Sequence, residues 1–120
     1  MQWEQLTVPT FARAVEECGR LCVVPVGVIE PHGTHLPLGQ DMFASHWLAC
    51  RAAEQEPALV FPPYPWGINH EAAHLSGAVV LRRRLVLEML ENICDEIARN
   101  GLTKILLLCG HGGNRFVLRL

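Results

Sequence analysis

Acidic side chains and histidines gather at two places in this 120-residue chain, and each place directly follows an apolar segment. The first place holds Glu30, His32, His35 and Asp41, and the second holds His111 within a glycine-rich turn. Mixed histidine and carboxylate ligands suit zinc, manganese or ferrous iron, and they lack the thiolates of most structural zinc sites. The two clusters therefore predict an open, catalytic metal site.

Each of these residues also has a simpler explanation. Asp41 suits the N-cap of a helix, and Glu30 and His32 can hydrogen-bond at the end of a strand. The glycines around His111 can bind an anion or a nucleotide at a helix N-terminus, although their spacing is not that of a Walker loop and no lysine follows. The joint placement of both clusters at strand ends favours the metal site over these alternatives.

Two predicted strands position these clusters. Residues 21–29 form a continuous, valine-rich apolar run, which is typical of a strand buried on both faces, and residues 104–109 indicate a second buried strand. Side chains two apart on extended backbone share a face, so Glu30 and His32 should point the same way. Because ligands of open α/β sheets bind beyond the carboxyl ends of the strands, we expect the two clusters to converge.

Helices alternate with these strands along the chain. Apolar residues at spacings of three and four predict helices over residues 7–18, 41–55 and 83–100. Short strands are expected at 58–61 and 77–81. This alternation predicts an α/β fold with a mostly parallel sheet covered by helices.

Two irregular segments complete the pattern. Residues 64–76 combine prolines, rings and histidines, so they suit a site-forming loop, although a plain surface loop is an open alternative. After the turn at 110–114, Asn114 is a natural N-cap for a helix that starts at Arg115.

The composition narrows the class of protein. Half of the residues are hydrophobic and 18% are charged, which predicts a packed core, and the net charge of −2 argues against a nucleic-acid partner. The longest apolar run is far shorter than the 18 or more residues of a membrane span, and the first ten residues do not resemble a signal peptide. Five cysteines cannot all be bridged within one chain, so we expect reduced thiols and a cytoplasmic protein.

Three motifs resemble those of the creatininase (creatinine amidohydrolase) family. The segment PVGVIEPHGTHLPLGQD, from Pro25 to Asp41, resembles its first signature, and GHGGN at Gly110–Asn114 resembles its second. Tyr64–Gly77 is similar to its middle motif, with Glu71 and Gly77 in the matching places. The resemblance covers essentially all of the chain and implies a three-layer α/β/α hydrolase.

The resemblance also implies a site for two divalent ions, zinc, manganese or iron, which activate a water for hydrolysis of an amide C–N bond. By position, Glu30 and His111 would bind one ion, His32 would bind the other, and Asp41 would bind both. Creatininase itself completes the second ion's ligands with a glutamate at the position that is Gly113 here.

Further residues are expected near the reaction. With Glu30, His35 is expected to take part in catalysis, either by orienting a ligand or by transferring a proton. Trp66, Glu71 and His74 are expected to border the substrate, although Trp66 suits packing equally well and the other two suit an oligomer contact.

We expect residues 1–120 to be the N-terminal part of a single creatininase-like domain in a longer protein. The leading hypothesis is hydrolysis of a cyclic amide or formamide-type small molecule by a homo-oligomer, with a hexamer as one possibility. The alternative is a non-catalytic or incomplete family member that acts as a metal-binding or assembly module.

Overall fold

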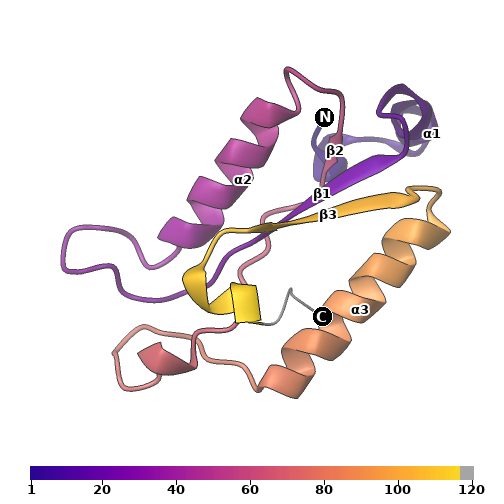
Figure 1. The fold of residues 1–120 in the computed structure, drawn as a ribbon. Helices are drawn as coiled ribbons and strands as arrows, with labels where there is room; N and C mark the ends of the chain where they lie inside the picture. Colours follow the sequence, from indigo (N-terminus) through magenta and orange to yellow (C-terminus); the bar gives the residue numbers. More distant parts are fainter. Residues whose placement is uncertain (117–120) are drawn as a thin grey trace.

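Strand β1 (Leu21–Val26) lies at the centre of a three-stranded parallel sheet in the computed structural model, which describes residues 1–116 (Figure 1). It pairs with β2 (Leu59–Val60) on one side and with β3 (Lys104–Cys109) on the other. All pairings in this sheet are parallel, so both carboxyl ends that carry the predicted clusters lie at the same edge. The predicted α/β class is confirmed.

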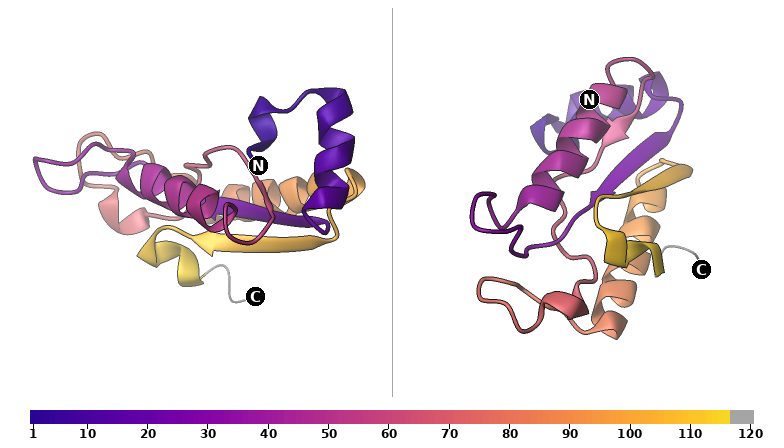
Figure 2. Two further views of the ribbon diagram at one scale, coloured as in Figure 1. Left: turned by 90° about the horizontal axis from the view of Figure 1, so that it is seen from above. Right: turned by 60° about the vertical axis from the view of Figure 1, so that its left-hand side comes forward.

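Helices cover both faces of this sheet. Successive side chains of a strand point to opposite faces. Cys22, Val24 and Val26 of β1 accordingly pack with α1 (Val8–Glu17) and α3 (Arg83–Arg99). Val23 packs on the opposite face with α2 (Gln40–Ala52). The result is three layers, with the central strand buried from both sides (Figure 2).

The helices form where the apolar spacing predicts them. In α3, Val86, Leu90 and Ile97 lie on one stripe and are buried against the sheet. The helix ends at Arg99, and Gly101 follows with a positive φ of 93°, a backbone conformation that glycine adopts without strain. No helix among residues 1–116 is long and apolar enough to cross a membrane.

Two strand predictions are wrong. Residues 77–81 form no strand, because the only ladder-type bond there runs from the Val79 N–H to the Ile29 carbonyl, at 3.0 Å. Strand β3 is not buried on both faces, and Leu106 is 53% exposed. The core on the α2 side gathers mainly residues of α2, β1 and β2 and takes only Leu108 from β3, so the rest of that face of β3 is open.

Three short 3-10 turns complete the described chain: Trp3–Gln5, His70–Ala72 and Gly112–Phe116. The last of these replaces the start of the helix predicted from Arg115. The rest of that predicted helix lies outside the described residues.

Candidate metal centre

The site lies where β1 and β3 end and α2 begins. Gly27, just after β1, lies so close to α2 that an added Cβ would stand 2.5 Å from the backbone N and Cα of Met42. This close approach brings the first turn of α2 against the segment that carries Glu30. The helix is capped by Gly39, so Asp41 is not the N-cap and its carboxylate is available to the site.

Asp41 lies between two histidines and offers one oxygen to each. Its Oδ1 is 3.0 Å from His32 Nε2, and its Oδ2 is 2.7 Å from His111 Nδ1. Glu30 Oε1 lies 3.4 Å from His111 Nδ1 and 3.9 Å from His32 Nε2. The four predicted metal-ligating residues therefore come together, although His111 is 70 positions or more from the other three.

These groups contain more acceptors than neutral imidazoles can satisfy. A neutral imidazole carries one N–H, yet both ring nitrogens of His32 face acceptors, because its Nδ1 lies 3.1 Å from the Glu30 carbonyl oxygen. Both nitrogens of His111 face carboxylates, Asp41 on one side and Glu71 at 3.0 Å on the other. Positive charge is needed between these groups, either as extra protons or as bound cations.

Glu30 points to the same conclusion. It is only 9% exposed, and its Oε2 has no hydrogen-bond partner within the described part of the chain. A buried carboxylate oxygen without a donor is costly, and a cation beside the carboxylate or a proton on it would offset that cost. The donor set of carboxylate oxygens and imidazole nitrogens fits zinc, manganese or ferrous iron.

The charges in the cluster shift two pKa values. Burial lowers the pKa of His111, but the hydrogen bond to Glu71 and the charges of Glu30 and Asp41 outweigh it, so that the net pKa is raised. The pKa of Glu71 is lowered, first by its own backbone N–H; burial opposes this shift, and the hydrogen bond and charge of His111 add to the lowering. Both shifts favour the charged forms that hold His111 and Glu71 together.

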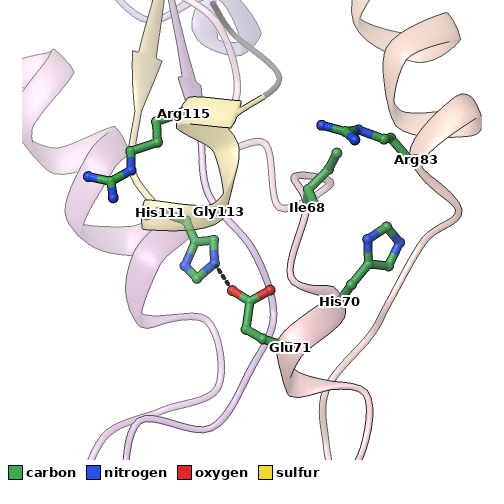
Figure 3. Close-up of a pocket in the computed structure, with 8 residues that line it drawn as sticks. Ile68, His70, Glu71, Arg83, His111, Gly113 and Arg115 are labelled. Carbon is green, nitrogen blue, oxygen red and sulfur yellow. Dashed lines mark hydrogen bonds and ion pairs between the residues drawn. The ribbon is translucent and has the colours of Figure 1, made fainter.

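A cavity of about 780 Å³ opens beside the cluster. Three segments line it: the loop around Ile68–Glu71, the start of α3, and the turn that follows β3. Figure 3 shows the His111 ring pointing toward the Glu71 carboxylate in the lining of this cavity, with their hydrogen bond marked. A small molecule in this cavity would contact the exposed side of the cluster.

Four other residues were predicted near the reaction, and they do not all lie at the cluster. Of the three expected to border the substrate, only Glu71 reaches the cluster. Trp66 is half-buried and packs against the main core, and His74 is exposed on the loop that follows the 3-10 turn. His35 is also exposed, with its ring beside Gly33.

Asn114 has a role that the sequence does not predict. It is not an N-cap: it is 2% exposed, its Oδ1 accepts the Ile68 N–H at 2.7 Å, and its Nδ2 donates to the Val26 carbonyl at 2.9 Å. Its amide thus ties the turn that carries His111 to the end of β1 and to the loop that carries Glu71. An asparagine in a glycine-rich turn gives no signal for such a role, because the partners are distant in sequence.

Comparison with known proteins gives one family. A family model described as "Creatininase: Creatinine amidohydrolase" matches residues 4–120. The creatinine amidohydrolase of Pseudomonas putida is 27% identical over 115 residues, which cover 92% of this chain and 44% of that protein. The mycofactocin precursor peptide peptidase of Mycolicibacterium smegmatis is 33% identical over 100 residues, which cover 78% of this chain and 40% of that protein.

Solved structures agree with this result. The structure described as "Creatininase Mn" superposes with a TM-score of 0.86 at 27% identity, over 96% of this chain and 47% of that one. A further one, "E122Q mutant creatininase, Zn-Zn type", also gives a TM-score of 0.86, at 26% identity over 98% of this chain and 48% of that one. This chain spans less than half the length of the curated relatives it matches.

Proposed function

This chain belongs to the creatininase family, whose matched relatives include a creatinine amidohydrolase and a peptidase, and we propose that it binds divalent metal ions for hydrolysis of a C–N bond. The substrate we propose is a small cyclic amide or a formamide-type molecule. One observation carries the proposal: every ring nitrogen of His32 and His111 faces an oxygen acceptor around the buried carboxylate of Glu30.

We propose that these side chains hold two ions. Glu30 and His111 would hold one ion and His32 the other, with Asp41 between them, since its two oxygens face different histidines. The matched structures named as Mn and Zn-Zn creatininases support this choice of metal. A bound divalent ion of this kind polarises a carbonyl group and lowers the pKa of a water molecule.

The protein's own groups orient the reactants and move protons. In hydrolysis, the water oxygen joins the carbonyl carbon, the C–N bond breaks, and the nitrogen leaves with a proton. We propose that Glu30, which would hold one ion through Oε1, accepts the proton from the water at Oε2 and returns it to the nitrogen. We propose that His35 assists the reaction from its exposed loop, and that Glu71, at the cavity wall, borders the substrate together with Trp66 and His74.

We also propose that the protein self-associates, with a hexamer as one possible assembly. Three large apolar side chains on α2 are exposed, namely Phe43, Trp47 and Leu48, and exposed apolar patches of this kind favour association. All five cysteines are free, which suits the reducing cytoplasm that we propose as its location. Light scattering of the purified protein measures its oligomeric state.

Metal content tests the main proposal. Protein purified without chelator should contain zinc, manganese or iron by elemental analysis, and titration calorimetry with Zn²⁺ or Mn²⁺ should show up to two sites. Asp41→Asn should weaken binding by more than about tenfold, because the shared carboxylate loses its charge. Asp95→Asn, on the exposed face of α3, is the matched control and should bind as tightly as the wild type.

Activity is tested separately. Hydrolysis of creatinine and of simple formamides by the metal-loaded protein supports the amidohydrolase assignment. Binding without turnover of any such amide supports the alternative, an incomplete family member that acts as a metal-binding or assembly module. A wild-type protein that contains no metal and binds none on titration refutes the metal-dependent hydrolase and leaves only the assembly module.

A further inference from the structure

We propose that Glu71 is a positioning residue of the metal centre, which selects the nitrogen through which His111 binds metal. Its carboxylate accepts the Nε2–H of His111 and so leaves Nδ1 without a proton. This inference rests on the proposed function, because it concerns how one of the proposed ligands is held.

The two sides of the His111 ring differ. Nδ1 faces the buried carboxylates, 2.7 Å from Asp41 Oδ2 and 3.4 Å from Glu30 Oε1. Separations of this size are those of neighbouring ligands that each lie about 2.0–2.2 Å from a shared ion. Nε2 faces away from them, 3.0 Å from Glu71 Oε1, which is an ordinary hydrogen-bond distance.

Ligating histidines generally donate their second ring N–H to a carboxylate or carbonyl, which fixes the tautomer and the orientation of the ring. Glu71 meets that description, because within residues 1–116 it is the hydrogen-bond partner of Nε2. Its side chain is 61% exposed, so an isolated surface ion pair would be the simpler explanation. The way its loop is held argues against that explanation.

The loop that carries Glu71 is tied to the turn that carries His111. Asn114, three residues after His111, accepts the Ile68 N–H, three residues before Glu71. Asn69, which is 1% exposed, donates to the Ile29 carbonyl at 3.2 Å and so fixes the same loop to the segment that precedes Glu30. Hydrogen bonds of two buried asparagines therefore hold the backbone that carries Glu71 beside the turn that carries His111.

Gly113 makes this approach possible. A Cβ at position 113 would collide with the carbonyl oxygen of Ile68 and stand 3.0 Å from His111 Nε2. A residue larger than glycine would push the loop outward and separate Glu71 from the ring. The glycine at position 113 thus provides the space that the proposed role of Glu71 requires.

A different arrangement would use Glu71 as a ligand. Glu30, Glu71 and His111 each offer an atom within 4.8 Å of the others. The two nitrogens of an imidazole point to different sides of the ring, so an ion at Nδ1 does not reach Glu71. In this alternative arrangement the metal is bound to Nε2, which makes the two arrangements distinguishable.

The experiment combines zinc affinity with NMR of the histidine rings. In zinc-loaded protein labelled with ¹⁵N-histidine, and with the signals assigned through His111→Ala, His111 should be metal-bound at Nδ1 and protonated at Nε2. Glu71→Ala should lose the hydrogen-bonded Nε2–H signal and bind zinc about 10–100-fold more weakly. Glu71→Gln, which keeps an acceptor oxygen, should lose less, and Glu91→Gln on the exposed face of α3 should lose nothing.

Two results would overturn the inference. One is a Glu71→Ala protein that binds zinc as tightly as the wild type, and the other is a wild-type His111 that binds zinc through Nε2. Either result leaves the proposed metal centre intact, whereas a wild type that binds no zinc removes both the centre and the role of Glu71.

Discussion

Removal of the Asn114 side chain should destabilise the protein far more than removal of a surface asparagine. Asn114→Ala deletes two hydrogen bonds at a position that is 2% exposed. It leaves the buried Ile68 N–H without a partner, whereas the Val26 carbonyl keeps the Gly110 N–H at 2.9 Å. A buried polar group that loses its partner costs about 1–3 kcal/mol, and the loss of one of two bonds at a carbonyl costs about 0.5–1.5 kcal/mol. We therefore expect the free energy of unfolding to fall by about 2–4 kcal/mol.

Urea unfolding followed by circular dichroism at 222 nm measures this change. Asn100→Ala is the matched control, because Asn100 Nδ2 donates a single exposed bond to the Glu96 carbonyl and should cost less than about 1 kcal/mol. Asn114→Asp keeps the acceptor for Ile68 but turns an oxygen toward the Val26 carbonyl, so it should be at least as harmful as alanine. If Asn114→Ala and Asn100→Ala cost the same, the buried amide does not hold the site together.

Three further predictions follow from buried positions. Gly27→Ala should shift α2, because its Cβ would stand 2.5 Å from the Met42 backbone, and it should lower both the free energy of unfolding and the zinc affinity. Gly112→Ala has open space around the new Cβ and should change the free energy of unfolding little. Urea unfolding and titration calorimetry compare the two variants. Burial of Tyr64 raises its pKa to about 12, so the folded state holds this proton more tightly than the unfolded state does, and the free energy of unfolding should fall by about 2 kcal/mol between pH 10 and 12. Tyr64→Phe should lack this fall, and at neutral pH it should be as stable as the wild type or more so, since the hydroxyl has no hydrogen-bond partner within residues 1–116; an equal fall in both proteins would refute the assignment to Tyr64. Burial likewise raises the pKa of Cys22 to about 12, so a disulfide reagent at pH 8 should react first with exposed Cys109 and with Cys22 only after unfolding, and Cys109→Ser should remove a fast phase from the reaction.

The sequence predicted the helices and strands well where local pattern and tertiary packing agree. The predicted strand at 104–109 matches β3, and the amphipathic pattern of α3 predicted its ends to within one residue. The segment 77–81 has an equally apolar pattern, yet among the described residues a single backbone hydrogen bond, from Val79 to Ile29, joins it to a distant segment. Local pattern cannot show whether a partner strand lies beside a segment.

One part of the candidate site could likewise be predicted from the sequence and another part could not. Glu30, His32, Asp41 and His111 were predictable because the ends of parallel strands meet at one edge of a sheet. The contact of Glu71 with the outer nitrogen of His111 was not predictable, because it depends on the path of an irregular loop and on the buried amide of Asn114. Such contacts depend on tertiary distances that sequence spacing does not encode.

The order of the strands has a consequence for how the site forms during folding. Strand β1 pairs along its whole length with β3, and partners such as Cys22 and Ile105 are more than 80 positions apart in the chain. Closing a loop of that length carries a large entropic cost, and contacts at such long range slow folding. The three proposed ligands that follow β1, namely Glu30, His32 and Asp41, therefore meet His111 only after β1 and β3 have paired. An ion that binds after docking stabilises the folded state by mass action, so metal should slow unfolding as well as support chemistry.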